Sequence, residues 1–185
     1  MRGVFVAVVG PSGVGKDSLI RFAQNRLGAD VSFVRRVVTR PADSGSEDHD
    51  TMALADFARA EAAGQFALSW DAHGLRYGLP ASLDEDLDRG RVVVANLSRG
   101  VIGALMRRYP DAVVVSVTAQ REVIARRLEG RGRETPESIQ RRLERSVPGE
   151  RMPASTVVID NSGALETAGE HFVRLLEDLA GLRVG

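Results

Sequence analysis

The chain has 185 residues, of which 43% are hydrophobic, and this is enough for one substantial core. Its 25 acidic and 25 basic residues balance, so the charge of the whole molecule favours neither nucleic acid nor a membrane as a partner. The absence of cysteine excludes disulfides, thiol catalysis and cysteine-based zinc sites. No Pro/Gly/Ser-rich linker or repeat divides the chain, so we expect a single domain over residues 1–185. We expect it to be cytoplasmic, because the first apolar run is too short for a signal peptide or a transmembrane helix.

The first predicted element is a buried parallel strand over residues 4–9, which is continuously apolar. A glycine-rich segment follows, and a helical pattern begins at Ser18. This order is that of a phosphate-binding loop, in which backbone amides and the positive end of a helix hold phosphate oxygens. Lys16, the only lysine of the chain, has the position that contacts the β- and γ-phosphates. The predicted ATP-binding residues here are Gly10, Pro11, Ser12, Gly13, Val14, Gly15, Lys16, Asp17 and Ser18.

One position of this loop departs from the usual pattern. Asp17 stands where a hydroxyl normally binds Mg²⁺, and the hydroxyl comes one residue later, as Ser18. A carboxylate beside a polyphosphate is repelled unless a divalent cation lies between them. We therefore predict that Asp17 is a metal-site residue, through direct or water-mediated contact. The alternative is that Asp17 only stabilises the first turn of its helix.

Strands and helices alternate in much of the remaining chain. Apolar runs predict strands at residues 31–38, 91–96, 112–118 and 156–160. Apolar residues at three- and four-residue spacing predict helices at residues 102–109, 122–129, 136–145 and 165–179. This alternation predicts an α/β fold with a mainly parallel sheet and helices on both faces. Its ligand crevice is expected at the carboxyl ends of the strands.

Two segments interrupt the alternation. The first, about residues 39–89, has a polar loop, a helical pattern near 54–63 and a pattern of short antiparallel strands at 65–77. We interpret it as an inserted subdomain that binds the phosphate acceptor. The second, about residues 130–134, lies between two predicted helices and is interpreted as a lid.

Arginines gather where a reaction between two polyanions would need them, unless they merely cover solvated helix faces. Positioning and charge neutralisation are almost the whole of phosphoryl-transfer catalysis, and an ionised phosphate acceptor needs no general base. The inserted region also carries His49 and His73, which are candidates for acceptor contact. The arginines near the second strand and around the predicted lid are Arg35, Arg36, Arg40, Arg126, Arg127, Arg131, Arg133, Arg141 and Arg142.

Over nearly its full length the chain resembles guanylate-kinase-type P-loop kinases. The matching segments are residues 10–16, 38–41, 45–49, 77–78, 127–132 and 159–161, together with Arg142. The resemblance implies a three-layer P-loop kinase fold, in which Lys16 holds the phosphates while Arg131 and Arg142 close on the transferring phosphoryl group. It also implies that Arg40 binds the acceptor phosphate and that Asn161 lies near adenine.

The chain departs from guanylate kinases at the positions that read their acceptor. Leu68 and Leu79 stand where those enzymes have a glutamate and a serine, and Asp43 replaces their second phosphate-binding arginine. Because apolar side chains cannot read the hydrogen-bonding edge of guanine, GMP is a poor candidate. Asn96 also stands where an aspartate is expected. A negative charge moved from that strand end to Asp17 would preserve the net charge around the metal.

The combination of residues 15–18, 36–41, 47–49 and 72–78 instead resembles the ribose 1,5-bisphosphate phosphokinase family. This resemblance implies transfer of the γ-phosphoryl group of ATP to the 1-phosphate of ribose 1,5-bisphosphate, with Mg²⁺, in phosphonate breakdown. The product would be 5-phosphoribosyl 1-diphosphate, and the partners would be two small molecules, ATP and a sugar bisphosphate. The predicted acceptor-binding residues are Arg36, Arg40, His49, His73 and Tyr77.

Two other interpretations stay open from the sequence. A nucleoside monophosphate kinase with altered base specificity would share the fold and the mechanism, and only its acceptor would differ. A non-catalytic guanylate-kinase-like binding module would be expected to have lost its phosphate loop and lid, yet the cationic residues of both are present.

Overall fold

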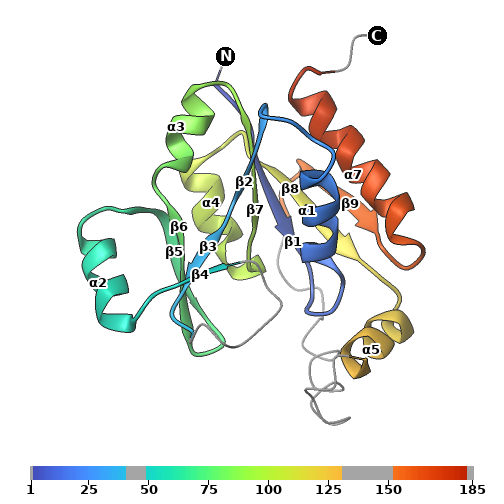
Figure 1. Ribbon diagram of the computed structural model, residues 1–185, viewed down its shortest axis with the longest axis horizontal. Coiled ribbons are helices and arrows are strands. Elements are labelled where there is room, and N and C mark those ends of the chain that lie inside the picture. The colour runs from blue at the N-terminus through green and yellow to red at the C-terminus, as the bar shows by residue number, and fades with distance from the viewer. Residues whose placement is uncertain (1, 41–48, 131–151, 183–185) are drawn as a thin grey trace.

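The central sheet is parallel throughout and has the strand order β2-β7-β1-β8-β9 (Figure 1). The computed structural model describes residues 2–40, 49–130 and 152–182. The predicted α/β class is confirmed. The five strands are β1 (Phe5–Val9), β2 (Val31–Val34), β7 (Val92–Asn96), β8 (Val113–Thr118) and β9 (Thr156–Asp160).

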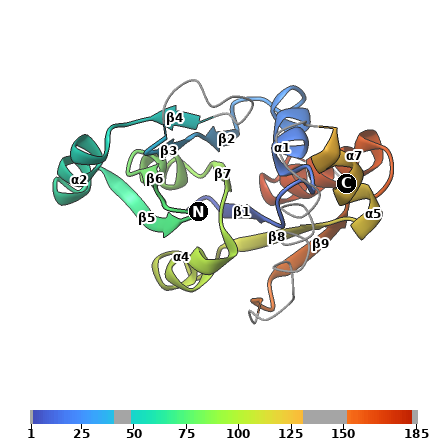
Figure 2. The same cartoon turned by 90° about the horizontal axis from the view of Figure 1, so that it is seen from below.

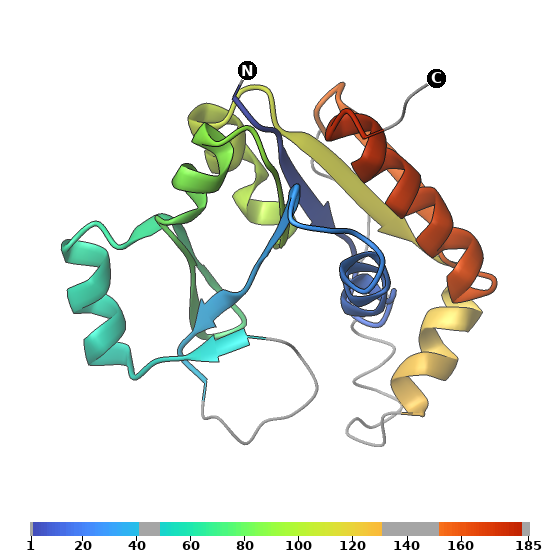
Figure 3. The same ribbon diagram turned by 45° about the horizontal axis from the view of Figure 1, so that its top comes forward.

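Helices cover both faces of this sheet, and every residue of β1 is buried as a consequence. Val6 and Val8 face the core beneath two helices, α1 (Lys16–Gln24) and α7 (Leu165–Leu179). The other three residues of β1, Phe5, Ala7 and Val9, face a second core, which is covered by α3 (Leu83–Asp88) and α4 (Ile102–Arg108) (Figure 3). Burial on both faces explains why β1 is a continuous apolar run and does not alternate with polar residues.

The two helices on the first face pack closely. A Cβ atom at Gly169 of α7 would lie 2.5 Å from the Phe22 ring of α1, so only glycine allows this approach. The contact fixes α1 on the sheet, and α1 is the helix that begins at the glycine-rich loop.

The second sheet has four strands in the order β4-β3-β6-β5 and, with α2 (Leu54–Ala62), projects to one side of the molecule (Figures 1 and 2). Its strands β5 and β6 form the antiparallel pair expected near residues 65–77. They are joined by His73 and Gly74, which both have positive φ angles, 53° and 74°, as in a two-residue hairpin turn. The strands are β3 (Arg36–Val38), β4 (His49–Thr51), β5 (Phe66–Ala72) and β6 (Leu75–Pro80).

Residues 31–38, predicted as one strand, form two strands in different sheets. The last residue of β2, Val34, pairs with Ala95 of the central sheet, while Val37 pairs with Gly78 of the second sheet. Arg35 lies exposed at the crossing. The segment is divided because its two halves pair with different sheets. The apolar pattern of the sequence does not indicate this change of pairing partner.

The remaining elements are α5 (Arg121–Glu129) and the short helix η1 (Arg99–Val101). The predicted helix at residues 136–145 and the predicted lid lie outside the described residues, apart from Gly130. Within the described ranges no helix is long and apolar enough to cross a bilayer.

Candidate active site

The glycine-rich loop between β1 and α1 has positive φ angles at its glycines, a backbone conformation that other residues rarely adopt. Gly15 has φ 97° and directly precedes α1, and a Cβ atom there would lie 2.5 Å from Nδ2 of Asn161. Gly13 has φ 83°, and a Cβ atom there would lie 2.9 Å from the Leu128 side chain. Larger residues at either position would therefore meet both backbone strain and a steric clash. The loop leads directly into the first turn of α1, whose amides have no intrahelical partners.

Lys16 is the first residue of α1, and its ammonium bends back over the loop. Its Nζ atom donates to the carbonyl oxygens of Gly10, at 2.9 Å, and Pro11, at 3.1 Å. A compact cation is thereby held beside the backbone that would surround a bound phosphate group.

Two side chains from distant parts of the chain donate hydrogen bonds to the backbone of the loop. Asn161 follows β9, is only 2% exposed, and donates from Nδ2 to the carbonyl oxygen of Val14 at 2.8 Å. Arg127 of α5 donates to the same carbonyl oxygen at 3.1 Å and to that of Asn161 at 2.9 Å. The loop is thus tied to the carboxyl end of β9 and to α5. The sequence included Arg127 in a matching segment but gave no sign of this role.

Asp17 lies opposite the end of β7, where it meets Asn96. The Nδ2 atom of Asn96 donates to Oδ1 of Asp17 at 2.7 Å, although the two residues are 79 positions apart. A carboxylate can only accept, so this contact fixes the orientation of the Asn96 amide and leaves its Oδ1 pointing elsewhere. Among the described residues no group of three or more acidic, histidine or cysteine side chains could hold a metal. One carboxylate suits Mg²⁺, which commonly completes its coordination with substrate phosphates and water.

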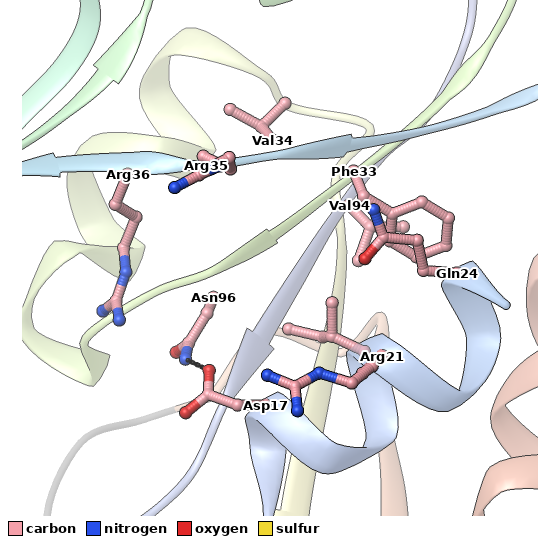
Figure 4. Close-up of a pocket in the computed structure, with 10 residues that line it drawn as sticks. Asp17, Arg21, Gln24, Phe33, Val34, Arg35, Arg36, Val94 and Asn96 are labelled. Carbon is pink, nitrogen blue, oxygen red and sulfur yellow. Dashed lines mark hydrogen bonds between the residues drawn. The ribbon is translucent and has the colours of Figure 1, made fainter. Parts of the chain in front are cut away.

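A cleft opens beside this pair, between α1 and the strands β2 and β7 (Figure 4). Three arginines line it together with Asp17, and Figure 4 shows the Arg36 and Arg21 side chains extending toward the Asp17–Asn96 pair. Its positive side chains outnumber its negative one, so the cleft favours an anionic ligand. The lining residues are Asp17, Ile20, Arg21, Gln24, Phe33, Val34, Arg35, Arg36, Val94 and Asn96.

Arg36 connects this cleft to the second sheet. It is 8% exposed, and its guanidinium lies over the Tyr77 ring, 5.6 Å from the centroid. Tyr77 stacks in turn on Trp70, with ring centroids 5.5 Å apart, and the Trp70 Nε1 atom donates to the Ser98 hydroxyl at 3.1 Å. These contacts form a row, Arg36, Tyr77, Trp70 and Ser98, that connects the cleft to the loop after β7. The contacts of Trp70 and Ser98 were not predicted.

The other predicted acceptor residues are placed less closely together. His49 is opposite Arg36 in the β3–β4 register, and Arg40 follows β3 by two residues. His73 lies exposed at the tip of the β5–β6 hairpin. Arg131 and Arg142 lie outside the described residues.

A charged network holds the second sheet to α2. Arg76 of β6 donates to both carboxylate oxygens of Glu61, at 2.8 and 2.9 Å, and the Ser69 hydroxyl also donates to Glu61. The hydrogen bonds from Ser69 and Arg76 lower the pKa of Glu61, and those to Glu61 raise the pKa of Arg76. The Arg76 backbone also makes two hydrogen bonds with Thr39, the residue before Arg40. Thr39 N donates to Arg76 O at 3.0 Å, and Arg76 N donates to Thr39 Oγ1 at 2.9 Å.

Comparison with curated proteins gives full-length similarity to one group of enzymes. The chain is 53% identical over 182 residues to a ribose 1,5-bisphosphate phosphokinase from Chelativorans sp., covering 97% of this chain and 87% of the relative. It is 48% identical over 181 residues to the enzyme of the same name from Brucella melitensis, covering 97% and 94%. No protein-family model matches the chain.

Among solved structures, a guanylate kinase from Anaplasma phagocytophilum is similar, with a TM-score of 0.67 and 19% sequence identity. The match covers 96% of this chain and 86% of that one. At this level of identity the similarity concerns the fold, and it confirms the guanylate-kinase-like P-loop kinase architecture expected from the sequence.

Proposed function

The chain belongs to the ribose 1,5-bisphosphate phosphokinase family, and we propose that it transfers the γ-phosphoryl group of ATP to the 1-phosphate of ribose 1,5-bisphosphate, giving 5-phosphoribosyl 1-diphosphate and ADP. The observation that carries this proposal is similarity over nearly the whole chain, together with a phosphate loop whose only lysine lies over its backbone. We place the reaction in the cytoplasm, within one kinase domain that has an acceptor-binding insert at about residues 39–89 and a lid at about 130–134.

The phosphate loop would hold ATP. Its backbone amides and the start of α1 would surround the β- and γ-phosphates, and the Lys16 ammonium would shift from the carbonyl oxygens of Gly10 and Pro11 to phosphate oxygens. Asn161 would lie near adenine, at the end of β9. Arg131 and Arg142 would stabilise charge on the transferring group, a role that rests on the sequence resemblance alone. The acceptor oxygen belongs to an ionised phosphate, so no residue need remove a proton.

Asp17 would hold Mg²⁺ together with the ATP phosphates. The metal would neutralise charge shared between the β- and γ-phosphates when it is bound. Asn96 supports this role because it donates to one carboxylate oxygen, at 2.7 Å, and leaves the other available. Asp17 and Asn96 are thus in contact, as the hypothesis of a relocated negative charge requires.

The acceptor would enter from the side of the second sheet. Arg36, Arg40, His49, His73 and Tyr77 are its proposed ligands, and Arg36 links them to the cleft beside Asp17. Leu68 and Leu79 are buried in the hydrophobic core, with exposed fractions of 8% and 0%. They are therefore not available to read a base, which favours a sugar bisphosphate over GMP.

Parallel assays with four acceptors test the proposal. ATP and Mg²⁺ are incubated with ribose 1,5-bisphosphate, GMP, AMP or dTMP, and ADP release is measured. We expect ribose 1,5-bisphosphate to have by far the highest kcat/KM. Comparable or higher efficiency with a nucleotide would instead indicate a nucleoside monophosphate kinase, and absence of turnover with all four would favour a binding module.

Lys16→Ala is the control for contaminating kinases. Loss of one preorganised charge that stabilises the transition state costs about 10²–10³ in rate, so this variant should be nearly inactive while it unfolds at the wild-type temperature. Near-normal turnover by the variant would overturn the phosphate-loop assignment.

A further inference from the structure

Three buried side-chain polar atoms lack a hydrogen-bond partner among the described residues: Asn96 Oδ1, Arg99 Nε and Asn161 Oδ1. All three residues follow or end parallel strands of the central sheet, at its carboxyl edge. A buried polar group without a partner costs about 1–3 kcal/mol, more if it is charged, and so is rare. Their common position at the ligand-binding edge indicates that these atoms are directed to ligands.

Arg99 is the exceptional member, because it is a cation. Three other partly buried arginines of the described residues have clear partners: Arg76 pairs with Glu61, Arg91 with Asp86, and Arg127 with backbone carbonyl groups. No hydrogen bond or ion pair of the Arg99 side chain is found within residues 2–40, 49–130 and 152–182, and its Nε atom is shielded from water. A structural arginine would be expected to have an acceptor for this group.

The position of Arg99 in the fold indicates which of the two substrates it would contact. It follows Ser98, whose hydroxyl accepts the hydrogen bond from Trp70 of the second sheet. It also follows β7, which lies between β1, the strand before the phosphate loop, and β2, which leads into the second sheet. Strand β9 lies on the opposite side of β1, beyond β8 (Figure 1). Asn161 follows β9, and Arg127 donates to its carbonyl oxygen. Arg99 is therefore on the acceptor side of the phosphate loop.

We propose that Arg99 is a further acceptor-binding residue, which donates its buried Nε–H and its neighbouring NH₂ group to a phosphate group of the sugar bisphosphate. This inference rests on the proposed function. An arginine presents two parallel donors that match two phosphate oxygens, and such a pair would satisfy the Nε atom. Each phosphate group carries about 1.5 to 2 negative charges near neutral pH, so a bisphosphate needs several cations.

Two variants and one control test Arg99. Arg99→Met removes the charge and the donors but keeps an unbranched chain, and Arg99→Lys keeps the charge without the paired geometry. Arg107→Met changes an exposed arginine of α4 in the same way and serves as the matched control. We expect Arg99→Met to raise the KM for ribose 1,5-bisphosphate by about tenfold to a hundredfold and that for ATP by less than about twofold. Arg99→Lys should be intermediate, and Arg107→Met should match wild type.

Thermal unfolding separates binding from a structural role. Loss of an unpartnered buried donor should leave the unfolding temperature of Arg99→Met unchanged or raise it. An unchanged KM for the acceptor would overturn the proposal. So would equal increases in both KM values together with a lowered unfolding temperature, because this combination marks a structural residue.

Calorimetry with ribose 5-phosphate and ribose 1-phosphate identifies the phosphate group that Arg99 holds, and it needs no turnover. Weaker binding of only one of these to Arg99→Met assigns that phosphate group, and unweakened binding of both overturns the proposal. If the wild-type protein does not turn over ribose 1,5-bisphosphate, the proposed reaction fails, and the ratio of the calorimetric affinities still decides the role of Arg99.

Discussion

At the scale of single residues, the contact between Asp17 and Asn96 joins two departures from the usual pattern of such kinases. The loop has a carboxylate where a hydroxyl is usual, and β7 ends in an amide where an acid was expected. The structure joins these two changes by a hydrogen bond of 2.7 Å. The pair has one negative charge in total, as it would have if the hydroxyl were in the loop and the acid at the strand end.

This pairing predicts the effect of moving the charge. Asp17→Asn removes it, so the Mg²⁺ concentration for half-maximal activity should rise by about tenfold, equivalent to about 1.4 kcal/mol of binding free energy. The double variant D17N/N96D returns the charge to β7 and lets the amide at position 17 donate to the new carboxylate. It should recover most of the Mg²⁺ affinity. Activity is titrated against Mg²⁺ at saturating ATP.

The competing account makes Asp17 a helix-stabilising residue. An acid in the first turn of α1 stabilises the helix by about 0.3–1 kcal/mol. Under that account Asp17→Asn lowers the unfolding temperature slightly and does not move the Mg²⁺ curve. An unshifted curve would leave this account as the better one.

The residues that sequence analysis could find are those in local motifs. Lys16 and the loop glycines are adjacent in the chain, and their spacing matches the pattern of loops that surround a phosphate group. Arg127 and Asn161 reach the loop from 113 and 147 positions away, to the carbonyl oxygen of Val14. The sequence around an arginine on a helix does not indicate which distant backbone oxygen its guanidinium will contact.

At the scale of elements, buried strands were predicted well because they are continuously apolar, as in β1. The division of residues 31–38 between two sheets was not foreseen, since pairing partners decide it. The helix α3 was also not predicted. It has six residues and is rich in acids, with only Leu83 and Leu87 buried, which is too little for a periodic pattern.

The network around Arg76 fixes the second sheet on α2, and its effect depends on pH. The pKa of Glu61 is lower in the folded protein than its usual value of 4.5, so the ionised form is the one that folding favours. Its contribution to stability is therefore complete above about pH 4.5 and is lost as the pH falls through the folded pKa.

Glu61→Gln should consequently destabilise the protein at pH 7, and the difference from wild type should shrink toward zero as the pH falls below about 4.5. Thermal unfolding at pH 7, 5, 4 and 3 measures this. Glu85→Gln is the matched control, because Glu85 pairs with Arg89 on an exposed helix face and such pairs contribute little. A difference between wild type and Glu61→Gln that stays constant down to pH 3 would contradict the assigned role of the ionised carboxylate.

At the scale of the whole molecule, we propose that the two sheets bind different substrates. Strand β1 of the central sheet leads into the phosphate loop, and the second sheet, which lies to one side of the central sheet (Figure 3), carries the proposed acceptor residues. Arg35 joins β2 of the central sheet to β3 of the second sheet. A row of contacts also joins them, from Arg36 through Tyr77 and Trp70 to Ser98. Binding of a phosphate group at Arg36 should therefore change the surroundings of Trp70, which lies in this row of contacts.

Trp70 offers a direct measurement, because it is the only tryptophan of the chain. Its indole lies between Tyr77 and the Ser98 hydroxyl, so an anion that neutralises Arg36 should change its fluorescence. We expect ribose 1,5-bisphosphate to change the emission by about a tenth or more, with half-saturation near its KM, and ATP alone to have a much smaller effect. Ser98→Ala, which removes the hydrogen bond, should shift the emission of the free protein and reduce the response to the acceptor. Turnover of ribose 1,5-bisphosphate without any change in emission at saturation would show that the acceptor is not bound at Arg36.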